Sequence, residues 1–262
     1  MTAAATAPVR APADLFRLDG RVAVVTGASS GLGARFVRVL AAAGATVYAA
    51  ARRLDRLEAL TTEDRRIHPV ACDVSRDCDR VRLIETVLAA GRGLDVLVNN
   101  AGTSGPPRAF DEDPAGVTDV LEVNLVAPFH LSCLAAAAAG EGRRTSMINV
   151  ASILGLVSAA PLGGASYAAS KAGLIGLTRE LAGQWGRRGV RVNALAPGWF
   201  RSEMTDELFA DARSSDWVDR NTMLRRGGAE HELDGALLFL ASDASTYCTG
   251  QVLVIDGGWT AR

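Results

Sequence analysis

Ser152, Tyr167 and Lys171 lie within or directly after a stretch of the chain that carries no charge. Residues 145–170 contain no Asp, Glu, Lys, Arg or His, and Lys171 follows Tyr167 by four positions. In a helix, two residues at this spacing share one face, one turn apart. A phenol beside an ammonium group shifts toward phenolate, because the positive charge favours the ionised form. The spacing predicts an acid/base pair, although Tyr and Lys four apart are also ordinary surface neighbours.

A glycine-rich segment near the N-terminus is the second feature that could contribute to a functional site. It runs from Thr26 to Gly33, between a β-branched run at 21–26 and a helix-forming segment at 34–43. Glycines let the backbone turn tightly and approach a phosphate, and a helix N-terminus offers unpaired N–H groups. The order of strand, glycine turn and helix predicts a nucleotide site. A purely structural tight turn is the alternative.

Two arginines follow the next predicted strand, 46–50. Ala51 occupies the position where an acidic residue would bind the ribose hydroxyls of NAD, and Arg52 and Arg53 come next. An arginine at this point accommodates the 2′-phosphate of NADP. NADP(H) is therefore favoured over NAD(H). The alternative is that both arginines begin a solvated helix whose own acidic residues neutralise them.

Strands and helices alternate along most of the chain. This alternation predicts an α/β fold, a Rossmann-type doubly wound parallel sheet of about seven strands flanked by helices. Ligands of such sheets bind beyond the carboxyl ends of the strands. The further predicted strands are 67–72, 94–98, 146–150, 191–196 and 252–255, and the further predicted helices are 76–90, one within 117–139, 167–185 and 232–240.

The domain organisation predicted from the sequence is simple. No repeat or linker divides residues 18–262, so we expect one dinucleotide-binding oxidoreductase domain preceded by a flexible arm, residues 1–17. Residues 199–226 break the alternation and carry apolar side chains. They could form a lid over substrate, or they could serve only as packing.

Composition excludes several classes of partner. The 262 residues include 28 basic and 29 acidic residues, a net charge of −1, so no field attracts nucleic acid or an anionic membrane. The four cysteines and three histidines lack the spacing of metal or disulfide frameworks. The N-terminus does not read as a signal peptide, which makes the cytoplasm the expected compartment.

Five motifs occur in order along the chain: the loop from Thr26 to Gly33, Asn99-Asn100-Ala101-Gly102, Ser152, Tyr167-x-x-x-Lys171, and Pro197-Gly198. With them the chain resembles the classical short-chain dehydrogenase/reductase family from residue 18 to the C-terminus. Within that family it is similar to the 3-oxoacyl carrier-protein reductases and to the gluconate 5-dehydrogenase-like sugar and polyol enzymes. The resemblance implies hydride transfer between a nicotinamide cofactor and a ketone or secondary alcohol.

The resemblance also implies the catalytic roles. Tyr167 would protonate the carbonyl oxygen during reduction, and Lys171 with the oxidised nicotinamide would lower its pKa from about 10. Lys171 would also bind the nicotinamide ribose. Ser152 would polarise the carbonyl, and Asn124 would organise a water near the lysine for proton relay.

For the cofactor, the resemblance assigns the pyrophosphate to glycines of the loop, adenine to Asp73 and Val74, and the adenosine ribose to Arg52. Asn99 would brace the central strand and the cofactor, and Ser202 would face the carboxamide. Ser30 departs from the family, because many NADP-using relatives carry a basic residue there. The full predicted set is Gly27, Ser29, Ser30, Gly31, Leu32, Gly33, Arg52, Arg53, Asp73, Val74, Asn99, Ala101, Gly102, Tyr167, Lys171, Pro197, Gly198 and Ser202.

The predicted substrate pocket is apolar, and its candidates are Leu154, Leu162, Trp199, Phe200 and Met204. Apolar side chains favour a hydrophobic or mixed carbonyl, although the same residues could fill the core. The family further implies a homotetramer, or a homodimer. Two alternatives stay open: an NAD-dependent alcohol or polyol dehydrogenase, and a cofactor-sensing protein without turnover.

Overall fold

A seven-stranded parallel sheet organises the computed structural model, which describes residues 9, 11–139, 144–160 and 163–261. Within these residues the strand order is β3-β2-β1-β4-β5-β6-β7. The predicted α/β fold is confirmed, and each strand lies within two residues of its predicted bounds. The strands are β1 (Val22–Thr26), β2 (Thr46–Ala51), β3 (Ile67–Ala71), β4 (Val96–Asn99), β5 (Thr145–Val150), β6 (Val190–Pro197) and β7 (Val252–Ile255).

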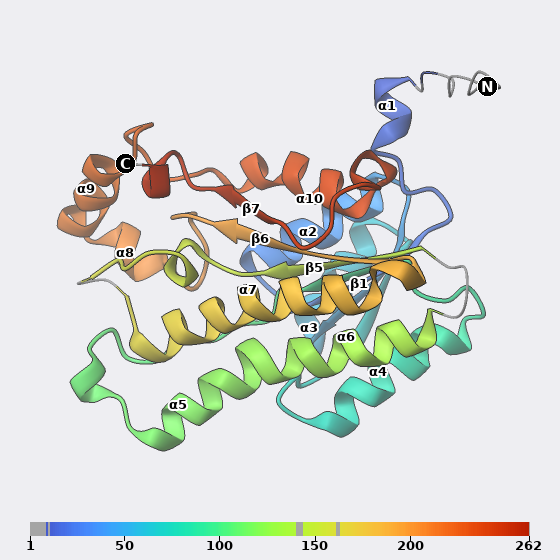
Figure 1. Ribbon diagram of the computed structural model, residues 1–262, viewed down its shortest axis with the longest axis horizontal. Coiled ribbons are helices and arrows are strands. Elements are labelled where there is room, and N and C mark those ends of the chain that lie inside the picture. The colour runs from blue at the N-terminus through green and yellow to red at the C-terminus, as the bar shows by residue number, and fades with distance from the viewer. Residues whose placement is uncertain (1–8, 10, 140–143, 161–162, 262) are drawn as a thin grey trace, which may run out of the picture.

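Helices cover both faces of the sheet (Figure 1). On one face lie α2 (Gly31–Ala42) and α10 (Asp234–Ala241); on the other lie α4 (Asp77–Ala89), α6 (Ala127–Ala138) and α7 (Ala165–Trp185). The remaining α-helices of the described part are α1 (Pro12–Leu15), α3 (Leu54–Glu63), α5 (Pro114–Leu121), α8 (Asp206–Ala210) and α9 (Ala212–Asn221).

The two helix layers explain why the central strands are apolar without alternation. Successive side chains of a strand point to opposite faces. Accordingly, Val25 of β1 packs in one core cluster with Phe36 of α2, whereas Val24 packs in the other with Leu131 of α6. All five residues of β1 are buried. A strand covered on both faces reads as a continuous hydrophobic run.

The order of the strands creates the site. The chain winds outward from β1 through β2 to β3 and then returns, so that β4 pairs with the other edge of β1. The loops at the carboxyl ends of β1 and β4 therefore diverge. In open α/β sheets this divergence leaves a crevice for ligands.

A long interrupted helix lies on the α7 side of the sheet. It runs through α5, a π-helical turn (Glu122–Val126) and α6. By length and composition alone, residues Pro114–Ala138 could cross a membrane. However, 44% of the apolar window is buried, and the segment contacts α4 and α7. A core helix of a globular protein has the same properties.

The N-terminal arm and the segment after β6 each agree only in part with what the sequence predicts. Of the arm at 1–17, residues 1–8 and 10 lie outside the described residues, and 12–15 form the short helix α1. The segment after β6 forms α8 and α9. Its Trp217 and Val218 pack against Trp199 and Trp259, which supports the packing interpretation for this part.

Candidate active site

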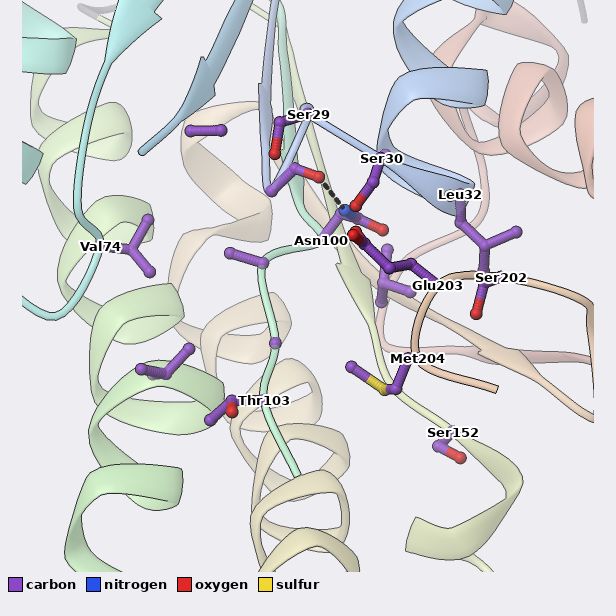
Figure 2. A pocket seen from close by; sticks show the side chains of 18 of the residues that line it. Ser29, Ser30, Leu32, Val74, Asn100, Thr103, Ser152, Ser202, Glu203 and Met204 are labelled. Atoms are coloured by element: carbon purple, nitrogen blue, oxygen red, sulfur yellow. Dashed lines mark hydrogen bonds between the residues drawn. The ribbon is translucent and has the colours of Figure 1, made fainter. Parts of the chain in front are cut away.

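A cavity of about 640 Å³ lies at the carboxyl ends of the central strands. It is open to one side and is lined by the glycine-rich loop, by the ends of β2 to β6 and by the segment that follows β6 (Figure 2). Of the predicted residues, the cavity brings together Gly27, Ser29, Ser30, Gly31, Leu32, Gly33, Arg52, Arg53, Asp73, Val74, Ala101, Gly102, Ser152, Tyr167, Lys171, Pro197, Gly198, Phe200, Ser202 and Met204.

The glycine-rich loop is packed too tightly for a side chain at Gly27 or at Gly33. Gly27 has a φ of +65°, and a Cβ there would lie 2.7 Å from the Cα of Ala101. A Cβ on Gly33 would lie 2.2 Å from the carbonyl oxygen of Gly27. The loop thereby leads directly into the first turn of α2, whose N-terminal N–H groups suit an anion. The shape and chemistry of this loop fit the pyrophosphate of a dinucleotide.

Hydrogen bonds fasten the loop to the end of β4. Thr26 Oγ1 accepts from the backbone N–H groups of Asn100 and Ala101, at 3.1 and 3.0 Å. Asn100 Nδ2 donates to the carbonyl oxygen of Thr26 at 2.9 Å. These contacts hold the two diverging loops of the crevice at a fixed separation. The sequence analysis did not single out Asn100, although it lies within a recognised motif.

Of the two arginines, Arg53 is the one held against the glycine-rich loop. Its Nε donates to Ser29 Oγ at 3.1 Å, and its Nη2 donates to Ser30 Oγ at 2.8 Å. Arg52 also lines the cavity but is exposed. Both arginines therefore lie at the cavity, and the assignment of Arg52 to the adenosine ribose stays a prediction. Arg53 lies at the N-cap of α3.

Glu203 neutralises Arg53, and the sequence analysis missed it. Its carboxylate pairs with Arg53 at 2.8 Å and with Arg56 at 3.2 Å. The expected neutralising groups lay within the helix after Arg53, whereas Glu203 comes from the segment after β6. No local sequence pattern could have found this pair.

Asp73 and Val74 line the cavity at the end of β3. Asp73 Oδ1 accepts from the N–H and hydroxyl groups of Ser75, at 3.0 and 2.8 Å, which shapes a tight turn. The carbonyl oxygen of Val74 accepts from the buried Arg80 at 2.6 Å. These hydrogen bonds hold the turn of Asp73 and Val74 in a fixed shape.

Ser152, Tyr167 and Lys171 converge at the end of β5. The side chain of Ser152 acts on the Tyr167 hydroxyl and favours its ionised form. Lys171 Nζ lies 5.5 Å from the centre of the Tyr167 ring and donates to the carbonyl oxygen of Val150 at 2.7 Å. Tyr167 and Lys171 lie one turn apart in α7, as their spacing predicted.

Burial sets the protonation of this group. It raises the pKa of Tyr167, and the side chain of Ser152 lowers it in part. Burial also lowers the pKa of Lys171 to about 8. Among the protein's own groups, desolvation of the phenolate has the largest effect on the pKa of Tyr167. Near neutral pH, Tyr167 is therefore protonated. The lowering of the Tyr167 pKa by Lys171 together with the oxidised nicotinamide stays a prediction.

Asn124 lies outside the cavity lining, in the π-helical turn, and is fully buried. Its Oδ1 accepts from Thr103 N at 2.9 Å, and its Nδ2 donates to Thr103 O at 2.8 Å and to Ser170 Oγ at 2.9 Å. A Cβ on Gly102 would lie 3.4 Å from Asn124 Oδ1 and 3.6 Å from Lys171 Nζ. Asn124 therefore lies close to Lys171, on the far side of Gly102. π-Turns are frequent at functional sites.

Asn99 also lies below the cavity rather than in it. Its Nδ2 donates to Asn149 Oδ1 at 2.9 Å and to Ser132 Oγ at 3.1 Å, in the core. It connects β4 to β5 and α6. This agrees with the expected brace of the central strand, without direct access to the cavity.

Glu112 caps the helix that carries Tyr167, and the sequence analysis missed it. Its two carboxylate oxygens accept from the backbone N–H of Ser166, at 3.3 and 3.1 Å. Ser166 is the second residue of α7 and directly precedes Tyr167. A carboxylate at a helix N-terminus stabilises the first turn.

The apolar candidates for substrate binding divide into two groups. Phe200 and Met204 line the cavity, whereas Leu154 and Trp199 pack in the aromatic cluster with Trp259. Trp199 is only 8% exposed, because it lies edge-on to the rings of Trp217 and Trp259. Leu162 lies outside the described residues.

The segment after β6 crosses close to the glycine-rich loop. Pro197, Gly198 and Ser202 line the cavity, as predicted. A Cβ on Gly31 would lie 3.2 Å from the Cβ of Ser202. Ser202 Oγ is hydrogen-bonded to Thr205 Oγ1 at 3.1 Å, and Thr205 Oγ1 donates to the carbonyl oxygen of Phe200 at 2.6 Å. These bonds fold the segment into a compact turn.

Comparison with known proteins gives relatives over nearly the whole chain. The family described as enoyl-(acyl carrier protein) reductase matches residues 27–260. The chain is 34% identical to 2-dehydro-3-deoxy-D-gluconate 5-dehydrogenase of Dickeya dadantii, covering 94% of this chain and 98% of that protein. It is 36% identical to the 3-oxoacyl acyl-carrier-protein reductase of Thermotoga maritima, covering 92% and 98%.

Solved structures agree with these sequence relatives. A gluconate 5-dehydrogenase of Burkholderia cenocepacia, in complex with NADP and tartrate, superposes with a TM-score of 0.88 at 33% identity, covering 95% of this chain and 99% of that one. The relatives are named dehydrogenases and reductases, so the chain is an NAD(P)-dependent oxidoreductase acting on CH–OH and C=O groups. Together, the sheet, the cavity and these matches establish that the chain belongs to the classical short-chain dehydrogenase/reductase family.

Proposed function

We propose that the protein reduces a ketone with NADPH and that Tyr167 is its general acid, with residues 18–262 acting as one oxidoreductase domain. The observation that carries this proposal is the convergence of Ser152, Tyr167 and the buried Lys171, one helical turn from Tyr167, in the wall of a cavity whose glycine loop fits a dinucleotide. Burial favours the protonated phenol near neutral pH. A protonated phenol suits reduction, in which the acid must give up a proton.

Each residue has one part in the reaction. The nicotinamide, when bound, supplies the hydride. Ser152 donates a hydrogen bond to the carbonyl oxygen and holds it near the phenol. Tyr167 gives its proton to that oxygen as negative charge develops there. Lys171, charged below pH 8, stabilises the phenolate that remains.

Asn124 contributes to this proton path from outside the cavity lining. The hydrogen bonds with Thr103 and Ser170 fix its amide, which lies next to Gly102 and close to Lys171 Nζ. We infer that it orders the water that returns a proton to Lys171. Ser170 is one turn of α7 from Tyr167 and donates to its carbonyl oxygen at 2.7 Å, so the same network also stiffens the helix.

The proposed preference for NADPH rests on the arginine end of the cavity. Arg53 donates to Ser29 and Ser30, Arg56 pairs with Glu203, and the end of β2 carries no acid that would bind ribose hydroxyls. The gluconate 5-dehydrogenase structure contains NADP. We assign the adenine to the turn of Asp73 and Val74, and the carboxamide of the nicotinamide to Ser202.

The substrate class follows from the apolar part of the cavity wall. Phe200 and Met204 line the same cavity as Ser152, which favours a hydrophobic or mixed carbonyl. The segment after β6 would close over it in part. We further infer a cytoplasmic homotetramer or homodimer, in which the exposed apolar side chains of the interrupted helix, such as Val126 and Phe129, contact a second copy.

Tyr167→Phe tests the proposal. The variant keeps the ring and its packing and removes only the hydroxyl, so NADPH binding should persist while kcat for ketone reduction falls by about 10³-fold or more. Reduction is followed by NADPH absorbance with a panel of ketoesters, ketosugars, cyclic ketones and acyl thioesters. Unchanged turnover would refute Tyr167 as the acid. A wild-type protein that binds NADPH but reduces none of the panel would favour a cofactor sensor.

A further inference from the structure

Glu203 bridges the cavity at the end where Arg53 lies. Its Oε1 and Oε2 accept from Nη1 and Nη2 of Arg53 at 2.9 and 2.8 Å, and Oε1 also accepts from Arg56 at 3.2 Å. Glu203 is 150 positions from Arg53 in sequence. In Figure 2 it lies beside Ser30 of the glycine-rich loop, which helps to lower the pKa of Glu203. The carboxylate therefore joins three parts of the cavity wall.

The contact uses the face of the guanidinium that a phosphate would use. Arg53 donates through two nitrogens to the two oxygens of Glu203, in the fork geometry that carboxylates and phosphates share. Ser29 and Ser30 hold the same guanidinium from the side of the loop. A phosphate at this point would meet Arg53 and Arg56 in place of the carboxylate, close to the hydroxyl of Ser30.

Another anion can displace Glu203 from its ion pair with Arg53. The side chains of Arg53 and Glu203 are 40% and 50% exposed, and exposed pairs contribute little to stability. Arg53 holds the pKa of Glu203 well below its usual range, so the carboxylate stays charged at any physiological pH. A phosphate monoester carries more negative charge than a carboxylate and can displace it.

We propose that Glu203 is a specificity-determining residue, an internal anion that occupies the place of the 2′-phosphate on Arg53 and Arg56 and must leave when NADP(H) binds. The inference rests on the proposed nicotinamide-dependent function. NAD(H) has no 2′-phosphate and leaves the ion pair intact. Glu203 therefore weakens the binding of NADP(H) but not that of NAD(H). It reduces the preference of the protein for NADP(H) over NAD(H).

Binding of cofactor fragments tests this directly. Glu203→Gln keeps the size of the side chain and removes its charge. By calorimetric titration, 2′,5′-ADP should bind about fivefold more tightly to the variant than to the wild type, since it no longer displaces an ion pair. Binding of 5′-AMP, which lacks the 2′-phosphate, should stay within about twofold. Glu207→Gln, an equal charge change at an exposed position of α8, is the matched control and should move neither value.

Two outcomes overturn the role of Glu203: an equal change for both fragments, or no gain for 2′,5′-ADP. A second measurement guards against a variant that is merely distorted. In an Arg53→Gln background, Glu203→Gln should lose most of its effect on 2′,5′-ADP, because the ion pair is already broken. A full effect in that background also contradicts the proposal. If the wild type binds neither NADPH nor NADH, the proposed function itself fails.

Discussion

The two ends of the cavity hold cations in opposite ways. At the acid/base end (Ser152, Tyr167 and Lys171), Lys171 is 3% exposed and donates to a backbone carbonyl group. At the arginine end (Arg53, Arg56 and Glu203), the side chains are about half exposed and lie in ion pairs. Burial strengthens electrostatic interactions and shifts protonation, whereas water and salt weaken them at the surface. The acid/base end therefore suits proton transfer, and the arginine end suits the reversible binding of an anion.

After Tyr167, the largest effect is expected from Lys171. Its pKa is lowered to about 8, so the ammonium loses its proton as the pH rises through 8. Tyr167 stays protonated over this range, because burial raises its pKa. We expect kcat/KM for reduction to be level from pH 6 to about 7.5 and to fall above about 8. Lys171→Met should lose about 100-fold at pH 7.

Lys171→Arg separates charge from structure. Arginine keeps its proton throughout this range, so the fall in kcat/KM should move to higher pH while the activity at pH 7 is partly retained. The measurement is the pH–rate profile of both proteins with one ketone. A wild-type profile that stays level to pH 9.5, or an identical limb in the arginine variant, would contradict the assignment.

A smaller effect is expected at the arginine end, and it should depend on salt. Arg53→Ala should weaken NADPH binding about tenfold and NADH binding much less, since only NADPH carries the 2′-phosphate. Arg65→Ala removes the same charge from an exposed side chain outside the cavity lining and serves as the matched control. Dissociation constants from fluorescence titration at low and high salt provide the measurement. Equal losses in the two variants would show that Arg53 has no special position.

The smallest effect is expected from Glu112, which positions the acid/base end without touching it. Glu112→Ala removes the acceptor for Ser166 N at the first turn of α7, so kcat should fall about threefold and Tm by about 2–4 °C. Glu112→Gln keeps an acceptor oxygen and should recover part of kcat. Glu85→Ala, at an exposed position of α4, is the control for stability. A loss of kcat as large as that of Lys171→Met would place Glu112 in the chemistry itself.

The sequence was sufficient wherever a motif acts through local geometry. Tyr167 and Lys171 are one turn apart in any helix, and a strand, glycine turn and helix form the same loop wherever they occur in this order. The apolar strands likewise predicted a sheet covered on both faces. For this reason the fold, the glycine loop and the acid/base end were all predictable.

Contacts between distant segments were not predictable, because no local pattern records them. Arg53, rather than Arg52, faces the loop only because the chain turns at the start of α3. Trp199 joins the core because Trp217 and Trp259 arrive from elsewhere in the chain. Glu112 reaches Ser166 across 54 positions.

The sequence by itself determined which side chains can do chemistry here and which strand ends carry them, since both depend on spacing along the chain. Only the tertiary structure decided how those side chains are charged and paired. Burial sets the pKa values of Tyr167 and Lys171, and the fold brings Glu203 onto Arg53. The physical reason is that desolvation and Coulomb interactions depend on distances through space, which the order of residues does not contain.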